Sequence, residues 1–129
     1  MYRIVKTFIQ TLWIALIAAA VLFMPQMAYA AEIQMGVDGM LVFEPCELTV
    51  DVGEKVTFIN NELPPHNVMF ADYQELSHGD LMFSAGESFD VTFEKAGDYY
   101  FQCDPHAGAG MKGVIHVSLW KKLFRASTF

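Results

Sequence analysis

The sequence predicts an all-β fold, a Greek-key antiparallel β-sandwich of seven or eight short strands. Apolar and polar residues alternate with a period of two in several segments after residue 30, which is typical of strands with one buried face. Glycine, proline, asparagine and aspartate mark turns between these segments at short intervals, as in sandwiches. The chain has 129 residues, enough for one such domain.

Residues 1–30 are excluded from this fold because they have the three parts of a secretory signal peptide. Arg3 and Lys6 precede an uninterrupted apolar run at residues 12–24, and Ala-Tyr-Ala at 28–30 is a small-x-small cleavage signal. The alternative is an uncleaved membrane anchor, but this run is short against the roughly 20 apolar residues that span a bilayer. We therefore expect cleavage after residue 30.

The mature chain would be strongly acidic. Six lysine and arginine residues against 15 aspartate and glutamate residues give it a formal charge of −9. Such a surface argues against a nucleic-acid partner and favours a protein partner with a basic docking patch. The alternative is that the charge only keeps a small exported protein soluble.

Five strands are expected in the first half of the mature chain. In order, they lie at residues 33–37, 41–43, 47–52, 55–61 and 67–71. The third shows the alternation most clearly, with Leu48, Val50 and Val52 separated by polar residues. The turn signals Asp38-Gly39 and Pro64-Pro65 separate neighbouring strands.

The second half begins with residues 72–81, which are the least strand-like and are expected to hold a helical turn. Strands follow at 88–94, 98–103 and 114–118. Tyr99, after Ala-Gly-Asp, resembles the tyrosine corner of Greek-key sandwiches, whose hydroxyl bonds to upstream backbone. We expect residues 31–118 to form the domain.

Residues 119–129 change in character. Large apolar side chains are mixed with basic ones, at Leu119, Trp120, Lys121, Lys122, Leu123, Phe124 and Arg125. One interpretation is a short amphipathic basic helix that contacts a membrane or the acidic body of the protein. The alternative is a frayed tail.

Four candidate metal ligands lie in two loops. Cys103, His106 and Met111 fall within nine residues, and His66 follows a Pro-Pro pair upstream. Two histidines, one cysteine and a weaker methionine are the ligand set of a blue-copper electron-transfer site. Cys103, His106 and His66 would bond copper in a plane, and Met111 would be the long axial ligand. Asn67 is a candidate for hydrogen bonding to the cysteine sulfur or to the opposite loop.

Two alternatives compete with copper at this motif. Zinc favours four comparably strong ligands, and methionine is a poor one for it. In an exported protein, Cys103 and Cys46 are also candidates for a disulfide. The histidine and methionine beside Cys103 favour the metal instead. Cys46 is then expected to be a small buried thiol, or a free thiol open to intermolecular pairing.

These residues resemble the plastocyanin family of small blue-copper proteins, over nearly all of residues 33–118. The resemblance is carried by Leu41-Val-Phe43-Glu-Pro45, Val56-Thr-Phe-Ile-Asn-Asn61, Pro65-His66-Asn67-Val68, Leu76-Ser77-His78 and Cys103-Asp-Pro-His106-Ala-Gly-Ala-Gly-Met111-Lys-Gly113. It implies a cupredoxin sandwich with one copper, acting as a monomeric electron carrier and not as an enzyme. It further implies a shuttle between cytochrome f and photosystem I in the thylakoid lumen.

The family also implies that electrons pass through the exposed edge of His106, within an apolar patch. Its counterparts here would be Leu41, Pro65, Pro105 and Ala109. Two departures concern docking, because Gln102 stands where the family usually has tyrosine and Ala107 where many cyanobacterial relatives have arginine. They predict an altered partner interface on a kept copper site.

Two other functions remain open. A cupredoxin carrier for a periplasmic redox partner would have the same chemistry with different partners. A copper-binding or copper-delivery protein would need an exchangeable site, whereas one closed Cys-His-His-Met site suits retention. An enzyme is the least expected class, because no further cofactor motif or catalytic set accompanies the site.

Overall fold

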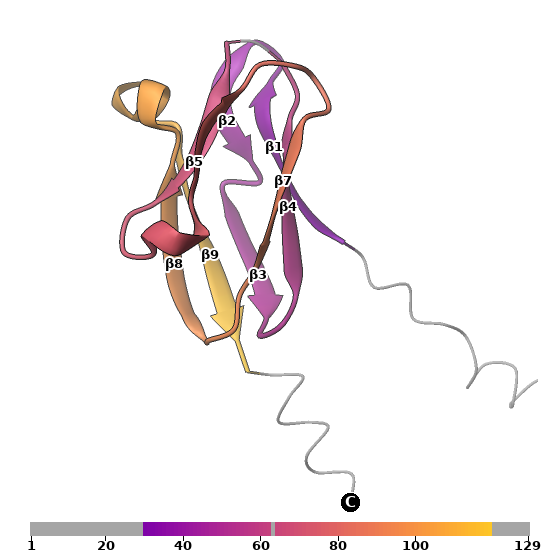
Figure 1. Cartoon of the computed structure of the whole chain (residues 1–129), viewed down its shortest axis with the longest axis vertical. Coiled ribbons are helices and arrows are strands. Elements are labelled where there is room, and N and C mark those ends of the chain that lie inside the picture. Colours follow the sequence, from indigo (N-terminus) through magenta and orange to yellow (C-terminus); the bar gives the residue numbers. More distant parts are fainter. Residues whose placement is uncertain (1–29, 63, 120–129) are drawn as a thin grey trace, which may run out of the picture.

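Two β-sheets packed face to face form the body of the molecule in the computed structural model (Figure 1). The structure describes residues 30–62 and 64–119, so the expected signal peptide and most of the tail lie outside the described residues. The four-stranded sheet has the order β2 (Met40–Glu44), β1 (Ala31–Val37), β4 (Lys55–Asn60), β7 (Ser88–Thr92). The five-stranded sheet has the order β3 (Glu47–Asp51), β9 (Lys112–Ser118), β8 (Gly97–Gln102), β5 (His66–Phe70), β6 (His78–Met82).

The predicted β-sandwich is confirmed, with nine strands among the described residues where seven or eight were expected. The ninth is β6, in the segment expected to be least strand-like, just after the helical turn η1 (Gln74–Leu76) that was expected there. Two pairs, β1 with β4 and β3 with β9, run parallel, and the other pairs are antiparallel. Alternation identifies the buried face of a strand but not the direction of its neighbour, so these parallel pairs were not predicted.

Aromatic rings from both sheets fill the space between the layers. Phe58 of β4 meets Phe101 of β8 edge-to-face, with ring centroids 5.2 Å apart and planes at 81°. Phe43 of β2 meets the same Phe101 ring at 4.8 Å. Such pairs contribute about 0.5–1.5 kcal/mol each beyond the area they bury. The rings therefore fix how one sheet sits on the other.

The tyrosine corner expected at Tyr99 is present. Its hydroxyl donates a hydrogen bond of 2.8 Å to the backbone carbonyl of Lys95. The ring is buried, and burial is the main cause that raises the pKa of the phenol, so the hydroxyl stays protonated and keeps donating. This contact holds the start of β8, the strand that leads to Cys103.

Of the two states expected for Cys46, the buried thiol is wrong and the free thiol is found. The side chain is exposed and not buried, and neither Cys46 nor Cys103 is in a disulfide. Cys46 follows a cis Glu44–Pro45 peptide bond, and its carbonyl accepts a hydrogen bond from the backbone of Val114. The backbone of Cys46 therefore joins the sheet while its thiol faces solvent.

No helix within the described residues is long and apolar enough to cross a membrane.

Candidate metal centre

The strand pairing brings the two candidate ligand loops to one end of the sandwich. β5 and β8 are antiparallel neighbours, so the start of β5, at His66, lies at the edge where β8 ends. Cys103 follows β8 directly, and the 3₁₀ turn η2 (Asp104–Ala109) carries His106 (Figure 1). Proline near the start of η2 and a left-handed Gly110 at its end turn the chain back into β9.

Three donor atoms converge at this end. The Nδ1 atoms of His66 and His106 lie 3.1 Å apart, and Cys103 Sγ lies 3.7 Å from the first and 3.4 Å from the second. The circumradius of a triangle with these sides is about 2 Å, close to the metal–nitrogen bond length of roughly 2.0–2.1 Å. The geometry therefore leaves a point from which one metal ion could bond all three atoms.

Met111, the predicted axial ligand, is fully buried beside these residues. Its backbone carbonyl accepts a hydrogen bond of 3.1 Å from the Cys103 N–H, and its own N–H donates to the His106 carbonyl at 3.2 Å. The backbone thus closes the loop so that Met111 lies next to Cys103 and His106. Its role as the fourth ligand stays a prediction.

Burial sets the charge state of the site. It is the main cause that raises the pKa of the Cys103 thiol, which backbone N–H groups of Asn67 and His106 lower to a smaller extent. Burial also lowers the pKa of His66, and His106 lowers it further, whereas Glu62 opposes them. Without a cation the site favours a neutral thiol and a neutral imidazole. A metal ion would displace the thiol proton and supply the positive charge that a buried thiolate requires.

Asn67 ties the two loops together, as one of its predicted roles requires. Its Oδ1 accepts a hydrogen bond of 2.8 Å from the backbone N–H of Asp104, the residue after Cys103. Its Nδ2 donates to the Gly79 carbonyl of β6 at 3.2 Å. A single buried side chain therefore positions η2 relative to both β5 and β6.

Gly36 is a site residue that the sequence analysis did not identify. It has a left-handed φ of +75°, and a Cβ built there would lie 2.9 Å from Nε2 of His66. That Nε2 atom is buried and has no hydrogen-bond partner among the described residues. Glycine within an expected strand is a signal for close approach of another group, and this was the available clue. The His66 ring can occupy its position because residue 36 has no side chain.

The other two histidines lie away from this centre. His78 is in β6, where its ring stacks on Phe89 with centroids 4.7 Å apart. His116 is on β9 and contacts Asp98 and Glu47. Neither takes part in the group of donor atoms found among the described residues.

The donor set fits copper better than it fits zinc. One thiolate and two imidazoles accommodate both Cu(I) and Cu(II), and a neighbouring methionine favours copper over zinc. Among the candidate ligands, His66 begins β5 and His106 lies in η2, and Cys103 and Met111 flank that turn. Backbone hydrogen bonds and Asn67 hold this part of the chain in place. A site of this kind can change oxidation state without exchanging its ligands.

A family model agrees with this assignment. Residues 31–118 match the model described as copper binding proteins of the plastocyanin/azurin family. Among curated proteins, a chloroplastic plastocyanin of Physcomitrium patens is 43% identical over 112 residues, which cover 80% of this chain and 67% of that protein. Plastocyanin of Scenedesmus fuscus is 45% identical over 94 residues, covering 66% of this chain and 96% of that one.

Solved structures show the same similarity. The oxidised form of plastocyanin from Dryopteris crassirhizoma gives a TM-score of 0.63 at 29% identity, over 68% of this chain and all of that one. An oxidised amicyanin mutant gives 0.58 at 34% identity, over 69% of this chain and 82% of that one. The β-sandwich is thus common to this chain and to these plastocyanin and amicyanin structures.

Proposed function

Because the chain belongs to the plastocyanin/azurin family of copper-binding proteins, we propose that it carries single electrons from cytochrome f to photosystem I. It is a blue-copper electron carrier, and the proposal concerns its ligands and its partners. His66, Cys103, His106 and Met111 are the proposed ligands of one copper ion. When bound, this ion supplies the one-electron chemistry by alternating between Cu(II) and Cu(I).

The observation that supports these ligands is the convergence of one sulfur and two Nδ1 atoms at one end of the sandwich. Cys103 and His66 are fully buried, and Asn67 holds the backbone next to Cys103. Fixed ligands reduce the rearrangement that accompanies a change of oxidation state, which favours fast transfer. The same rigidity argues against copper delivery, which requires release.

His106 is the proposed exit for the electron. Of the four proposed ligands it is the one that is partly exposed, whereas the other three are fully buried. Pro105 and Ala109 are exposed on the same turn, and Leu41 and Pro65 are half-buried. A small, uncharged surface of this kind suits a weak encounter that dissociates quickly after transfer. The acidic body would then steer a basic partner and govern the rate of association.

The domain boundaries and the location follow from the same proposal. Residues 1–30 would direct export and be removed, residues 31–118 would form the cupredoxin domain, and the protein would act in the thylakoid lumen. Two observations support the first boundary, because β1 begins at Ala31 and the family match begins at the same residue. Sequencing the N-terminus of protein purified from its source tests it.

The test of the function is a spectroelectrochemical titration of the copper-loaded protein, followed by transfer kinetics with isolated cytochrome f and photosystem I. We expect an intense visible thiolate-to-copper band that bleaches reversibly at a potential between those of the two partners. We also expect second-order electron transfer with both partners. If the band bleaches reversibly but neither partner exchanges electrons with the protein, the copper site is supported and the photosynthetic role is rejected.

A cupredoxin carrier for a periplasmic redox partner is the second candidate. The similarity to amicyanin structures at 31–34% identity supports it to the extent that this chain resembles copper proteins other than plastocyanin. The two candidates share the copper site and differ in partner. Preferential reaction with a soluble periplasmic redox protein, together with slow transfer to photosystem I, would support this second function.

A further inference from the structure

The outer face of the five-stranded sheet differs in character from one end to the other. This outer face consists of the side chains of β3, β9, β8 and β5 that point away from the core. Strand pairing arranges them in rows, in which Asp98 lies beside His116 and Gln102 beside Lys112. The row with Asp98 is near the end of β9, and the row with Gln102 is at the ligand end. The character of the face therefore changes along the direction of β9.

Carboxylates dominate the end at which β9 finishes. His116 contacts Asp98 Oδ1 through Nδ1 at 2.6 Å and Glu47 Oε1 through Nε2 at 3.1 Å. The side chain of Glu47 is 71% exposed and that of Asp98 is 54% exposed. Asp51 lies one row further on, where Ser118 donates to it at 2.7 Å. The acidic end thus presents carboxylates from two strands to solvent around a single imidazole.

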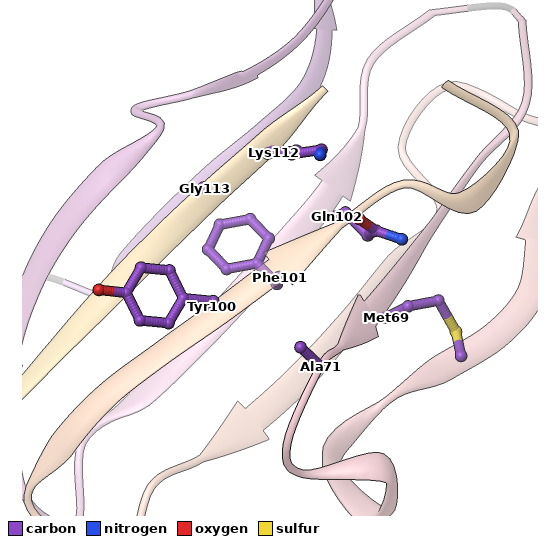
Figure 2. A pocket seen from close by; sticks show the side chains of 7 residues that line it. All are labelled: Met69, Ala71, Tyr100, Phe101, Gln102, Lys112 and Gly113. Atoms are coloured by element: carbon purple, nitrogen blue, oxygen red, sulfur yellow. The ribbon is translucent and has the colours of Figure 1, made fainter. Parts of the chain in front are cut away.

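The other end of the same face is apolar and hollowed. Met69, Ala71, Tyr100 and Gln102 surround a shallow depression of about 110 Å³, together with Phe101, Lys112 and Gly113 (Figure 2). Tyr100 is 58% exposed, which makes it one of the most exposed large hydrophobic residues among those described. An apolar hollow next to an acidic strip fits a segment that is both basic and aromatic.

This chain contains such a segment directly after β9. Residues 119–129 carry Trp120, Leu123 and Phe124 together with three basic residues and no acidic residue, a formal charge of +3. Residues 31–118 carry three lysines against 15 carboxylates, a formal charge of −12. β9 ends at Ser118, in the acidic part of the face. The basic segment therefore begins next to the acidic end of the outer face.

The length of the segment allows it to reach the hollow. From Ser118 back to Lys112 the strand spans six residues, or about 20 Å at roughly 3.4 Å per residue. The eleven residues 119–129 reach at most about 36–40 Å when extended. If three of these residues reverse the direction of the chain, the other eight still span the roughly 20 Å from Ser118 to Lys112.

We propose that residues 119–129 fold back onto the outer face of their own molecule. The basic side chains lie against Glu47 and Asp98, and an aromatic side chain covers the hollow beside Tyr100. A covalently linked segment meets this face at an effective concentration on the order of millimolar, so weak contacts suffice. An anionic membrane is the less favourable partner, since it would repel the domain that bears the segment. The docked segment covers the face next to Gln102, which leaves the His106 end as the open surface for a partner.

Trp120, two residues after Ser118, lies where the segment reverses direction, so it reports whether the segment is held against the acidic end of the face. The chain has two tryptophans, Trp13 and Trp120, so Trp13→Phe leaves a single emitter whether or not the N-terminal segment is removed. We expect Trp120 in the copper(I)-loaded protein to emit at shorter wavelength than in a free peptide of residues 119–129. The acrylamide quenching constant of Trp120 should be at most about one third of the value in the free peptide, because the linked segment is mostly bound at its effective concentration.

Three variants in this background locate the contact. Glu47→Gln/Asp98→Asn on the face, and Lys121→Gln/Lys122→Gln/Arg125→Gln on the segment, should each raise quenching toward the peptide value. The matched control Glu32→Gln/Glu44→Gln removes the same charge from β1 and β2 of the other sheet and should leave quenching unchanged. Circular dichroism checks that each variant is folded, and the segment variant alters no residue of the sandwich.

Two results would overturn the proposal. One is peptide-like quenching of Trp120 in the parent protein. The other is protection that develops only after addition of phosphatidylglycerol vesicles, which would assign the segment to a membrane surface. Amide chemical-shift differences between the full chain and a chain ending at Ser118 give a second check. They should fall on residues 47–51, 97–102 and 112–118, and shifts confined to the four-stranded sheet would contradict the docking position.

Discussion

At the scale of single residues, Gly113 lies in β9, just after the loop that carries Cys103 and His106. Its surroundings leave no room for a side chain. A Cβ built at Gly113 would overlap the Phe101 ring and lie 2.7 Å from the carbonyl oxygen of Cys46. The carbonyl belongs to backbone and the ring is locked among other aromatic rings, so neither neighbour can move far. Glycine at this position lets β9 pack closely on the core.

Gly113→Ala should therefore lower the free energy of unfolding by roughly 1–3 kcal/mol, the usual cost of overpacking. Urea unfolding at fixed copper loading measures it. Gly79→Ala in β6 is the matched control, because a Cβ there meets only Met69 Sδ at an ordinary 3.8 Å. An equal loss in both variants would show that strand glycines are generally intolerant and that the overlap at Gly113 is unimportant.

Cys103→Ser should abolish the visible thiolate-to-copper band and leave the sandwich folded, since the hydroxyl is a far weaker ligand than the thiolate. Cys46→Ser is the control, because that thiol is exposed and lies outside the group of donor atoms. Absorption and far-ultraviolet circular dichroism measure the two effects. Persistence of the band in the Cys103 variant would reject the ligand assignment.

The candidate ligands were predictable from sequence because three of the four lie in one short segment whose spacing suits a metal. Residues that act through the fold were not. Gly36 lies beside His66 only after β1 and β5 have been brought together. Cys46 was expected to be buried, yet the strand that follows it pairs through backbone and leaves the thiol in solvent.

At the scale of elements, His116 joins three strands through its two ring nitrogens. It lies on β9 and contacts Asp98 of β8 and Glu47 of β3. The contact with Asp98 is the main cause that raises the pKa of His116, burial opposes it, and Glu47 raises it further. The protonated ring thus links neighbouring strands on the outer face of the sheet.

The sign of the pH dependence follows from the raised pKa. The stabilisation from His116 is fully present below the ordinary histidine pKa of 6.5 and is lost as the pH rises through the higher folded value. We expect His116→Gln to flatten the decline in urea midpoint above pH 6.5. Urea midpoints of the two proteins across this range measure it, and parallel curves would contradict the role of the imidazole.

Strands with regular alternation were predictable because their pattern reports one buried face. β6 was not, since Gly79 and Asp80 interrupt its pattern and both are exposed. It pairs with β5 through an irregular register and has no other neighbour in the sheet. Its existence depends on the adjacent strand more than on its own residues.

At the scale of the whole molecule, the charge of the domain should govern its encounters. The formal charge of −12 over residues 31–118 attracts cations and repels anions over distances that salt reduces, with a Debye length of roughly 30 Å at 0.01 M and 10 Å at 0.1 M. Oxidation of the copper(I) protein by a cationic cobalt complex should slow as salt is added, and oxidation by ferricyanide should accelerate. Stopped-flow kinetics measures both, and the same salt response for both oxidants would exclude steering by net charge.

The layered architecture was predictable from the number of short strands, whereas the order of strands within each sheet was not. Local pattern carries no information on which distant segments meet. The parallel pairing of β3 with β9 joins residues 47–51 to residues 114–118, far apart in the chain. Such pairs depend on the complete set of layers and not on the segments themselves.

The position of β9 between β3 and β8 has a consequence for the order of events during synthesis. The five-stranded sheet cannot close until the last strand of the domain has been made. One proposed ligand is separated from the others, since His66 is 37 residues before Cys103 and 40 before His106. In a growing chain, His66 therefore stays apart from the segment that carries Cys103 and His106, and the three donor atoms come together only when β5 pairs with β8.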